Sequence, residues 1–257
     1  MISFTRIYLA LICIITFFSF YIYLSKRINE SLISKEKKSD KRELVLDLIQ
    51  NPNEFVLKYV DLPFDFGYGS NSIPLVISAL ISNGDFLELG IGSFSTPLLH
   101  KMSIDYYRKL ISIDTNSDWV DKFKLYNDTR DHRVYLVENF ENLEDKIGSK
   151  NKKWGLVLVD HIEANKRPTH AKYYAEKSEI VIVHDAEKSS EIYYQYEANS
   201  LRSSFKQACK FSIYQNKEKT SYISTLILSN YIDLTILESI FEKVKTEFGH
   251  VACNLSF

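Results

Sequence analysis

The sequence predicts an α/β fold built on a doubly wound, mostly parallel sheet. Strand-like and helix-like segments alternate along most of the chain, which is the pattern of βαβ units. Two apolar runs, WGLVLV at 154–159 and EIVIV at 179–183, are continuous, as expected for central parallel strands covered on both faces. A short apolar strand that starts at Phe86 and Leu87 and ends at Glu88 leads into a glycine turn and a helix start, the arrangement of a nucleotide-binding turn.

Composition places the chain among folded globular proteins. Of its 257 residues, 45% are hydrophobic and 25% are charged, which suits one α/β domain with accessory segments. The net charge is −1 and the body of the chain has no basic stripe, so we expect no nucleic-acid partner. Cys13, Cys209 and Cys253 lack metal-binding spacing, so we expect free buried thiols, with at most one disulfide in the soluble part.

An uncharged run of 18 residues at 7–24 predicts a transmembrane helix, so the membrane is an expected partner. Lys26 and Arg27 follow the run instead of a small-residue cleavage site, which favours an anchor over a cleaved signal peptide. The next segment is polar and rich in Lys and Glu, which is typical of a stalk. The predicted organisation is an anchor at 1–25, a charged stalk at 26–42 and one domain at 43–257.

The flanks of the anchor bear on which side of an endomembrane the domain of this single-pass protein faces. Arg6 precedes the run, whereas five basic residues follow it within the window that sets orientation: Lys26, Arg27, Lys35, Lys37 and Lys38. This asymmetry favours the cytosolic side. The luminal side stays the alternative, because a short tail, one anchor, a polar stalk and a catalytic domain is the common layout of secretory-pathway transferases. Three sequons are compatible with it: Asn29, Asn127 and Asn254.

Three segments precede the first predicted strand. Apolar residues at helical spacing predict a short helix within 43–57, and a loop follows at 63–71. Ser72 then caps a helix whose apolar stripe ends at Asn83 and Gly84. We expect this helix to lead directly into the first strand.

The stretch DFLELGIGSFST at 85–96 combines a strand, a turn and a helix start. Glu88 lies at the carboxyl end of the strand, and Ser95 opens the helix. Gly90 and Gly92 let the backbone turn tightly beneath a ligand. We therefore expect a ligand-binding turn here.

Later segments continue the alternation. The strand-like run at 109–113 ends in Asp114, at about the spacing at which a carboxylate meets the two hydroxyls of an adenosine ribose. The remaining predicted elements are a helix at 117–126, strands at 133–137, 154–159, 179–183 and 220–228, and a helix at 234–244. The Tyr-rich segment 192–211 fits no element clearly.

Titratable residues close both continuous apolar strands. Asp160 and His161 follow the first strand, and His184 and Asp185 follow the second. Open α/β sheets place their chemistry outside the carboxyl ends of the strands. These four are therefore the candidate catalytic residues, with either histidine as a general base near neutral pH.

Four motifs occur in order: ELGIGSFSTPLLH at 88–100, SIDTNSDWV at 112–120, LVLVDH at 156–161 and IVHDAE at 182–187. With them the chain resembles class I S-adenosylmethionine-dependent methyltransferases over roughly residues 70–230. The resemblance implies a Rossmann-type sheet of seven strands, mostly parallel, with the last strand antiparallel. It also implies that S-adenosylmethionine is the cofactor, held by Glu88, Gly90, Gly92, Ser95, Asp114, Glu138 and Asn139.

The resemblance also distributes roles among these residues. The turn at 88–92 would hold the amino-acid end of the cofactor, Asp114 the ribose, and the turn at 137–139 would lie near the adenine. A nicotinamide-binding enzyme is the competing interpretation of the turn, but its fingerprint requires Gly or Ala where this chain has Ser95.

Asp160 and Asp185 also resemble the positions of two metal carboxylates in catechol-type O-methyltransferases. Those enzymes follow the second carboxylate with an Asn ligand, where this chain has Ala186. Octahedral coordination of Mg²⁺ would therefore need a substitute such as Glu187. A divalent metal stays an alternative to a histidine base.

Other candidates are expected to be structural. Four histidines are assigned to the surface or to packing: His100, His132, His170 and His250. A charged run is formed by Lys166, Arg167 and Pro168. It could bind an anionic substrate, although a solvated helix start is the commoner explanation. Three tyrosines could line an acceptor site or lie in the core or its rim: Tyr193, Tyr194 and Tyr196.

Together these features predict a membrane-anchored domain that transfers a methyl group to an unidentified acceptor, with a hydroxyl favoured. One alternative is a catalytically inactive module that keeps the fold and binds proteins. Another is a membrane-anchored sugar-nucleotide transferase, although no D-x-D-type motif stands at a strand end.

Overall fold

The computed structural model describes residues 58–59, 70–128, 130–214, 222–243 and 249–253. All of them belong to the compact unit Asp47–Phe257. The predicted anchor at 7–24, the stalk at 26–42, the helix at 43–57 and most of the loop at 63–71 lie outside the described residues. None of the helices in the described ranges is long and apolar enough to cross a membrane.

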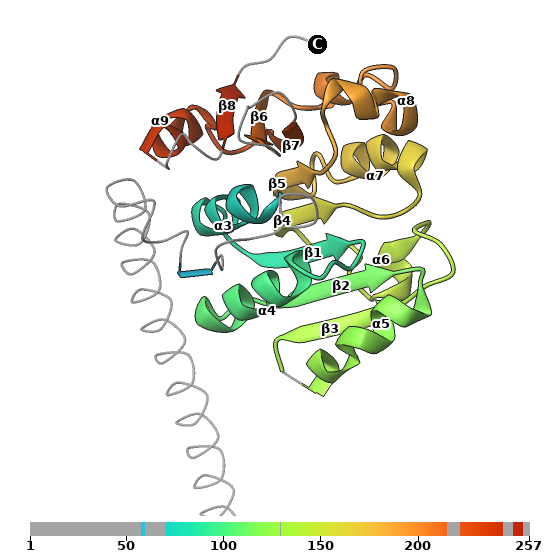
Figure 1. Ribbon diagram of the computed structural model, residues 1–257. Helices are drawn as coiled ribbons and strands as arrows, with labels where there is room; N and C mark the ends of the chain where they lie inside the picture. The colour runs from blue at the N-terminus through green and yellow to red at the C-terminus, as the bar shows by residue number, and fades with distance from the viewer. Residues whose placement is uncertain (1–57, 60–69, 129, 215–221, 244–248, 254–257) are drawn as a thin grey trace, which may run out of the picture. The chain divides into compact units, whose positions relative to one another are not determined.

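The described strands form one eight-stranded sheet in the order β3-β2-β1-β4-β5-β7-β6-β8 (Figure 1). They are β1 (Asp85–Leu89), β2 (Leu110–Asp114), β3 (His132–Leu136), β4 (Trp154–Val159), β5 (Ser178–Val183), β6 (Gln207–Tyr214), β7 (Tyr222–Ser229) and β8 (Gly249–Cys253). Strands β1 to β5 are parallel, whereas β7 is antiparallel to β5 and β6, and β8 is antiparallel to β6. The mostly parallel α/β sheet is confirmed, but the expected seven strands are wrong, because β8 adds an eighth beside β6.

The helices follow the strands in alternation. They are α3 (Ser72–Ile81), α4 (Ser95–Asp105), α5 (Ser117–Phe123), α6 (Leu143–Lys146), α7 (Arg167–Tyr173), α8 (Glu191–Tyr194) and α9 (Thr235–Lys243). The segment 192–211, which the sequence leaves unassigned, holds the end of α8, a 3-10 turn at Leu201–Ser204 and the start of β6.

The central strands are covered on both faces, as the continuous apolar runs predict. All six residues of β4 are buried. On one face, Leu87 and Val157 share a core cluster with Ala171 and Tyr174, which lie in and directly after α7. Side chains alternate along a strand, so Glu88 faces the opposite side, where it meets α4.

Helix α3 begins at Ser72 as predicted, but Ser72 is not its cap. Asn71 holds the N-cap position, and its side chain makes no capping hydrogen bond. Its amide instead donates to Asp160, with Nδ2 3.3 Å from Oδ2. The helix thus forgoes a cap worth about 1 kcal/mol, and the chain gains a polar side chain at the end of β4.

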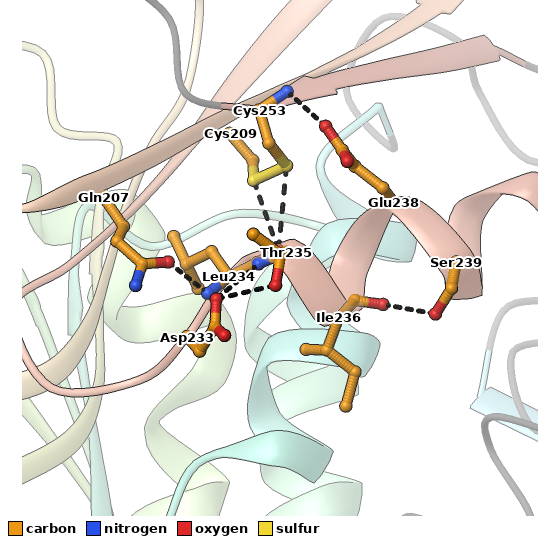
Figure 2. The surroundings of a disulfide bond; sticks show 9 residues. All are labelled: Gln207, Cys209, Asp233, Leu234, Thr235, Ile236, Glu238, Ser239 and Cys253. Atoms are coloured by element: carbon orange, nitrogen blue, oxygen red, sulfur yellow. Dashed lines mark hydrogen bonds between the residues drawn. A yellow bond between two sulfur atoms is a disulfide. The ribbon is translucent and has the colours of Figure 1, made fainter.

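A disulfide joins Cys209 in β6 to Cys253 in β8, which face each other in register (Figure 2). The expectation of free thiols is therefore wrong for this pair, while Cys13 lies outside the described residues. Glu238 of α9 accepts a hydrogen bond from Cys253 N at 3.2 Å. The disulfide closes a loop of 44 residues. In the chain-entropy account, a loop of this length corresponds to a stabilisation of the folded state by about 4 kcal/mol.

Candidate functional site

Close backbone packing sets the glycine turn after β1. Gly90 has a φ of +100°, which residues with a side chain rarely adopt. A Cβ at Gly90 would lie 2.4 Å from the carbonyl oxygen of Asp160. Asp160 N in turn donates to Leu89 O at 2.8 Å. The turn is therefore fixed against the end of β4, and only glycine fits at this contact.

The turn opens into the N-terminus of α4. Gly92 is partly exposed, and its N–H donates to Thr96 Oγ1 at 3.0 Å. A Cβ at Gly92 would lie 2.7 Å from Oγ of the buried Ser95. The absence of a side chain therefore leaves room in the turn at Gly92, while Ser95 at the start of α4 is buried. A helix N-terminus favours an anionic group beside it.

Glu88 lies beneath the turn rather than in it. Its carboxylate accepts hydrogen bonds from Thr96 Oγ1 at 3.0 Å and from Ser112 Oγ at 2.5 Å, and the residue has no exposed surface. Burial raises the pKa of Glu88 to about 7, although the hydroxyls of Ser112, Ser95 and Thr96 oppose this shift. In this structure Glu88 therefore supports the turn from inside the core.

A chain of hydrogen bonds continues from Glu88 toward the surface. Ser112 Oγ lies 2.9 Å from Nε2 of His132, and Nδ1 of His132 lies 3.1 Å from Nδ1 of His100. Burial lowers the pKa of His132 to about 3, which keeps the ring neutral. His132 is therefore a fully buried member of a polar chain.

Asp114 joins two turns through backbone groups. Its Oδ2 accepts from Ile91 N at 2.8 Å, and its Oδ1 accepts from Asn116 N at 2.8 Å. Each carboxylate oxygen keeps a second lone pair, which can accept from ligand hydroxyls. Asp114 thus lies beside the glycine turn, as the sequence predicts.

The turn after β3 lies at the same edge of the sheet. Val137 N donates to Asp114 O at 3.0 Å, which fixes this turn against β2. Glu138 is exposed, and Asn139 Oδ1 accepts from Lys146 Nζ at 3.0 Å. Both predicted adenine-side residues are therefore next to the turns held by Asp114.

A second group of side chains lies beyond the ends of β4 and β5. The nearest polar atoms of Asp160, His184 and Asp185 all lie within 4.8 Å of one another. His184 Nδ1 is 3.4 Å from Asp160 Oδ1 and 3.4 Å from Asp185 Oδ1. Asp185 has a φ of +55°, a left-handed conformation that is uncommon outside glycine and often marks a functional position.

Arg167, at the start of α7, lies between the two carboxylates. Its Nη2 is 3.1 Å from Asp160 Oδ1, and its Nη1 is 3.1 Å from Asp185 Oδ2. Its Nε donates to His161 O at 2.7 Å. The expectation of a solvated helix start is wrong for Arg167, which is 5% exposed, but it holds for Lys166, which is exposed and paired with Glu163.

His161 points elsewhere. Its ring is buried against Phe140, with 4.3 Å between ring centroids, and its Nε2 lies 2.7 Å from His170 Nδ1. Burial, together with His170 and Arg167, lowers the pKa of His161 to about 2. Of the two histidines that the sequence left equal, His184 lies with the carboxylates and His161 does not.

Two residues that the sequence did not single out complete the cluster. Ser70 Oγ lies 2.6 Å from His184 Nε2, and Asn71 donates to Asp160 as described above. Both come from the segment before α3, more than 80 positions away in sequence, with separations of 114 and 89. No local pattern connects them to the strand ends.

Two of the three predicted tyrosines border the cluster. Tyr194 OH donates to Asp185 Oδ2 at 2.8 Å, and its ring lies 4.4 Å from the Arg167 guanidinium carbon. Tyr196 OH donates to His184 O at 2.8 Å and is buried. Tyr193 is 64% exposed, so it does not take part.

The cluster holds its charges. Burial alone would lower the pKa of His184, but the carboxylates of Asp160 and Asp185 outweigh it and raise that pKa. Burial would raise the pKa of Asp160, but His184 and Arg167 outweigh it and lower that pKa. The neighbours therefore favour the ionised form of Asp160 and make the neutral His184 ring a stronger proton acceptor.

The donor set does not fit the octahedral oxygen coordination of Mg²⁺. Arg167 already holds one oxygen of each carboxylate, and Ala186 offers no ligand. Glu187, the possible substitute, is used elsewhere, because its oxygens accept from Ser224 N at 3.0 Å and from Ser190 Oγ. The cluster has the composition of an ion-pair network.

Strand β7 runs antiparallel between β5 and β6, beside five parallel strands whose first leads into the glycine turn. This Rossmann-like arrangement, with one reversed strand among β1 to β7, agrees with the sheet that the resemblance to class I methyltransferases implies. Neither a family model nor a curated protein matches it.

Solved structures are similar to the chain only at low identity. The O-methyltransferase TomG from Streptomyces achromogenes, in complex with SAM, is 12% identical over 71% of this chain and 89% of that chain, with a TM-score of 0.49. An O-methyltransferase from Bacillus cereus, in complex with SAH, is 12% identical over 74% and 90%, with a TM-score of 0.48.

Proposed function

We propose that the protein transfers a methyl group from S-adenosylmethionine to an acceptor hydroxyl, with His184 as the general base. The observation that carries this proposal is the position of the His184 imidazole, which lies between two carboxylates at the end of β5. The backbone of Asp160 packs on Gly90 of the turn. Base and turn therefore share one rigid edge, and positioning is most of what methyl transfer needs.

The residues around the turn fit this cofactor. The partly exposed Gly92 precedes the N-terminus of α4, and a helix N-terminus favours a carboxylate nearby. Asp114 offers acceptors to ribose hydroxyls. Glu138 and Asn139 lie where the adenine is expected. Glu88 is buried beneath the turn, so it would support the turn and would not contact the cofactor. When bound, S-adenosylmethionine would supply an electrophilic methyl group on a sulfonium.

The chain's own residues account for the proton. The acceptor hydroxyl would lose its proton to His184 Nε2, which faces Ser70 rather than the carboxylates. Asp160 and Asp185 lie on the Nδ1 side, where they orient the ring and stabilise the imidazolium that forms. Asn71 Oδ1 is buried without a partner among the described residues, so a bound acceptor could satisfy it by donating a hydrogen bond.

Calorimetry on the full-length protein in detergent tests the cofactor. We expect S-adenosylmethionine and its demethylated product each to bind with a stoichiometry of one, at the same site. NAD and a sugar nucleotide should give no heat of binding. Circular dichroism on the same sample establishes that the protein is folded. A folded protein that binds neither sulfonium nor product would overturn the proposal.

A catalytically inactive module with the same fold is the second candidate. It is favoured by the burial of the cluster, because His184 is 6% exposed and its Nε2 already faces Ser70. Such a module would still bind the cofactor. Formation of S-adenosylhomocysteine in the presence of catechols, sugars and lipid extracts would exclude this candidate, whereas binding without any product would favour it.

We further propose that residues 7–24 anchor the protein and that its domain lies on the oxidising side of the membrane. The Cys209–Cys253 disulfide supports this side, because disulfides persist in oxidising compartments and are rare in the cytosol. The basic flank alone favours the opposite side. In sealed microsomes a carboxyl-terminal tag should resist protease until detergent is added, and a tag digested without detergent would contradict the proposal.

A further inference from the structure

The Arg167 guanidinium is held from several sides. It bridges Asp160 and Asp185 through two ion pairs, donates to the His161 carbonyl and lies over the Tyr194 ring. It is almost completely buried. A guanidinium is planar and keeps its charge, which suits a fixed bridge between two carboxylates better than an ammonium does.

We propose that the Arg167 guanidinium takes the place of a divalent cation between Asp160 and Asp185, so that this site works without metal. The inference rests on the proposed function and adds a positioning residue to it. Arg167 would hold the two carboxylates at the distances at which both meet His184 Nδ1.

Charge balance supports a guanidinium over a metal. Two carboxylates and one guanidinium leave one negative charge while His184 is neutral. The proton that His184 takes from an acceptor cancels that charge, which favours proton transfer. A divalent cation added to the same oxygens would lie beside the guanidinium and would make the cluster positive before the proton arrives. The two cations are therefore alternatives.

Removal of Arg167 should turn the cluster into a metal site. Asp160, Asp185 and His184 already lie within 4.8 Å of one another. Without the guanidinium, Asp160 Oδ1 and Asp185 Oδ2 would each lose an ion pair, and a cation could take its place beside them. We expect that Arg167→Ala raises the affinity for Mn²⁺ at least tenfold over the wild type. Lys166→Ala is the matched control, because it removes the exposed cation one residue earlier.

Electron paramagnetic resonance of Mn²⁺ titrated into the full-length protein gives the readout. Wild type, Lys166→Ala and Asp160→Asn should bind equally little Mn²⁺, and Arg167→Ala should bind one ion and gain thermal stability from it. Arg167→Lys keeps a cation and should recover part of the metal-free turnover that Arg167→Ala loses.

Two outcomes would overturn the inference. One is a wild-type protein that binds one Mn²⁺ which Asp160→Asn loses, and the other is a folded Arg167→Ala variant that binds no more Mn²⁺ than wild type. The first comparison stands even where Arg167→Ala does not fold. The Mn²⁺ titration needs no cofactor, so its failure is distinct from a failure to bind S-adenosylmethionine.

Discussion

The two halves of the carboxyl edge of the sheet treat a buried carboxylate in different ways. In the β1–β2 half, the described partners of Glu88 are hydroxyls, and burial raises its pKa to about 7. In the β4–β5 half, Asp160 meets His184 and Arg167, which outweigh the effect of burial and lower its pKa. In the first half burial favours the protonated form of Glu88, while in the second half the neighbouring cations favour the ionised form of Asp160.

The largest effect is expected from replacing the proposed base, and it tests whether the two halves differ in function. His184→Ala should lower turnover about 10²- to 10⁴-fold, because a positioned general base contributes that much, while affinity for the cofactor stays unchanged. His170→Ala, in a histidine that the cluster does not include, should retain turnover. Equal losses in both variants, measured as S-adenosylhomocysteine formation, would show that the charged half has no special role.

The contact between the halves should be the next most sensitive point. Gly90→Ala places a Cβ 2.4 Å from the Asp160 carbonyl oxygen at a φ of +100°, so we expect a loss of about 3 kcal/mol or more in urea unfolding. Gly148→Ala is the control, because its φ of +63° is also left-handed but no atom lies within 4 Å. It should cost about 1 kcal/mol. Similar losses in the two variants would mean that the halves are not locked together.

The pH dependence of stability sharpens the comparison on the Glu88 side. The pKa of Glu88 rises from 4.5 to about 7 on folding, so between these values the folded protein binds more protons than the unfolded chain. Stability should therefore decrease as pH rises through this window, by about 3 kcal/mol from this group. Glu88→Gln should flatten the decline in urea midpoints, and Asp118→Asn, in an exposed carboxylate, should not. A decline that persists in Glu88→Gln belongs to another group.

The smallest effect expected is on cofactor affinity. Asp114→Ala removes the acceptor that we propose for ribose hydroxyls, together with the acceptor for Ile91 N and Asn116 N. This change should weaken cofactor binding by about 1 to 3 kcal/mol. Calorimetry against wild type measures the change. Asp118→Asn again serves as the control, and an Asp114→Ala affinity equal to wild type would place the ribose elsewhere.

Sequence patterns predicted the parts of the site that follow strands. Gly90, Asp114, Asp160 and His184 stand where apolar runs end, and parallel strands bring their carboxyl ends to one edge. The sequence could not distinguish His161 from His184 as the base. The direction of a side chain that follows a strand depends on local backbone angles, which the sequence pattern does not give. Only the structure shows that His161 turns toward Phe140.

Other parts were missed for physical reasons. Arg167 reads as solvated because its neighbour Lys166 is charged, and burial of an arginine becomes plausible only with both carboxylate partners in view. The signal that could have found it is the position of Pro168 in the first turn of a helix that begins soon after Asp160. The disulfide was missed because it depends on β8, which the sequence did not predict.

The strand that this disulfide holds in place also affects how copies of the protein meet one another. Strand β6 has eight residues, and without β8 its outer backbone N–H and C=O groups would be open to pairing with a strand of another molecule. Strand β8 covers five positions of that edge, and the disulfide ties it covalently to β6. Strands β3 and β8 form the two edges of the sheet. Reduction of the Cys209–Cys253 disulfide would therefore make edge-to-edge aggregation easier at the β8 edge.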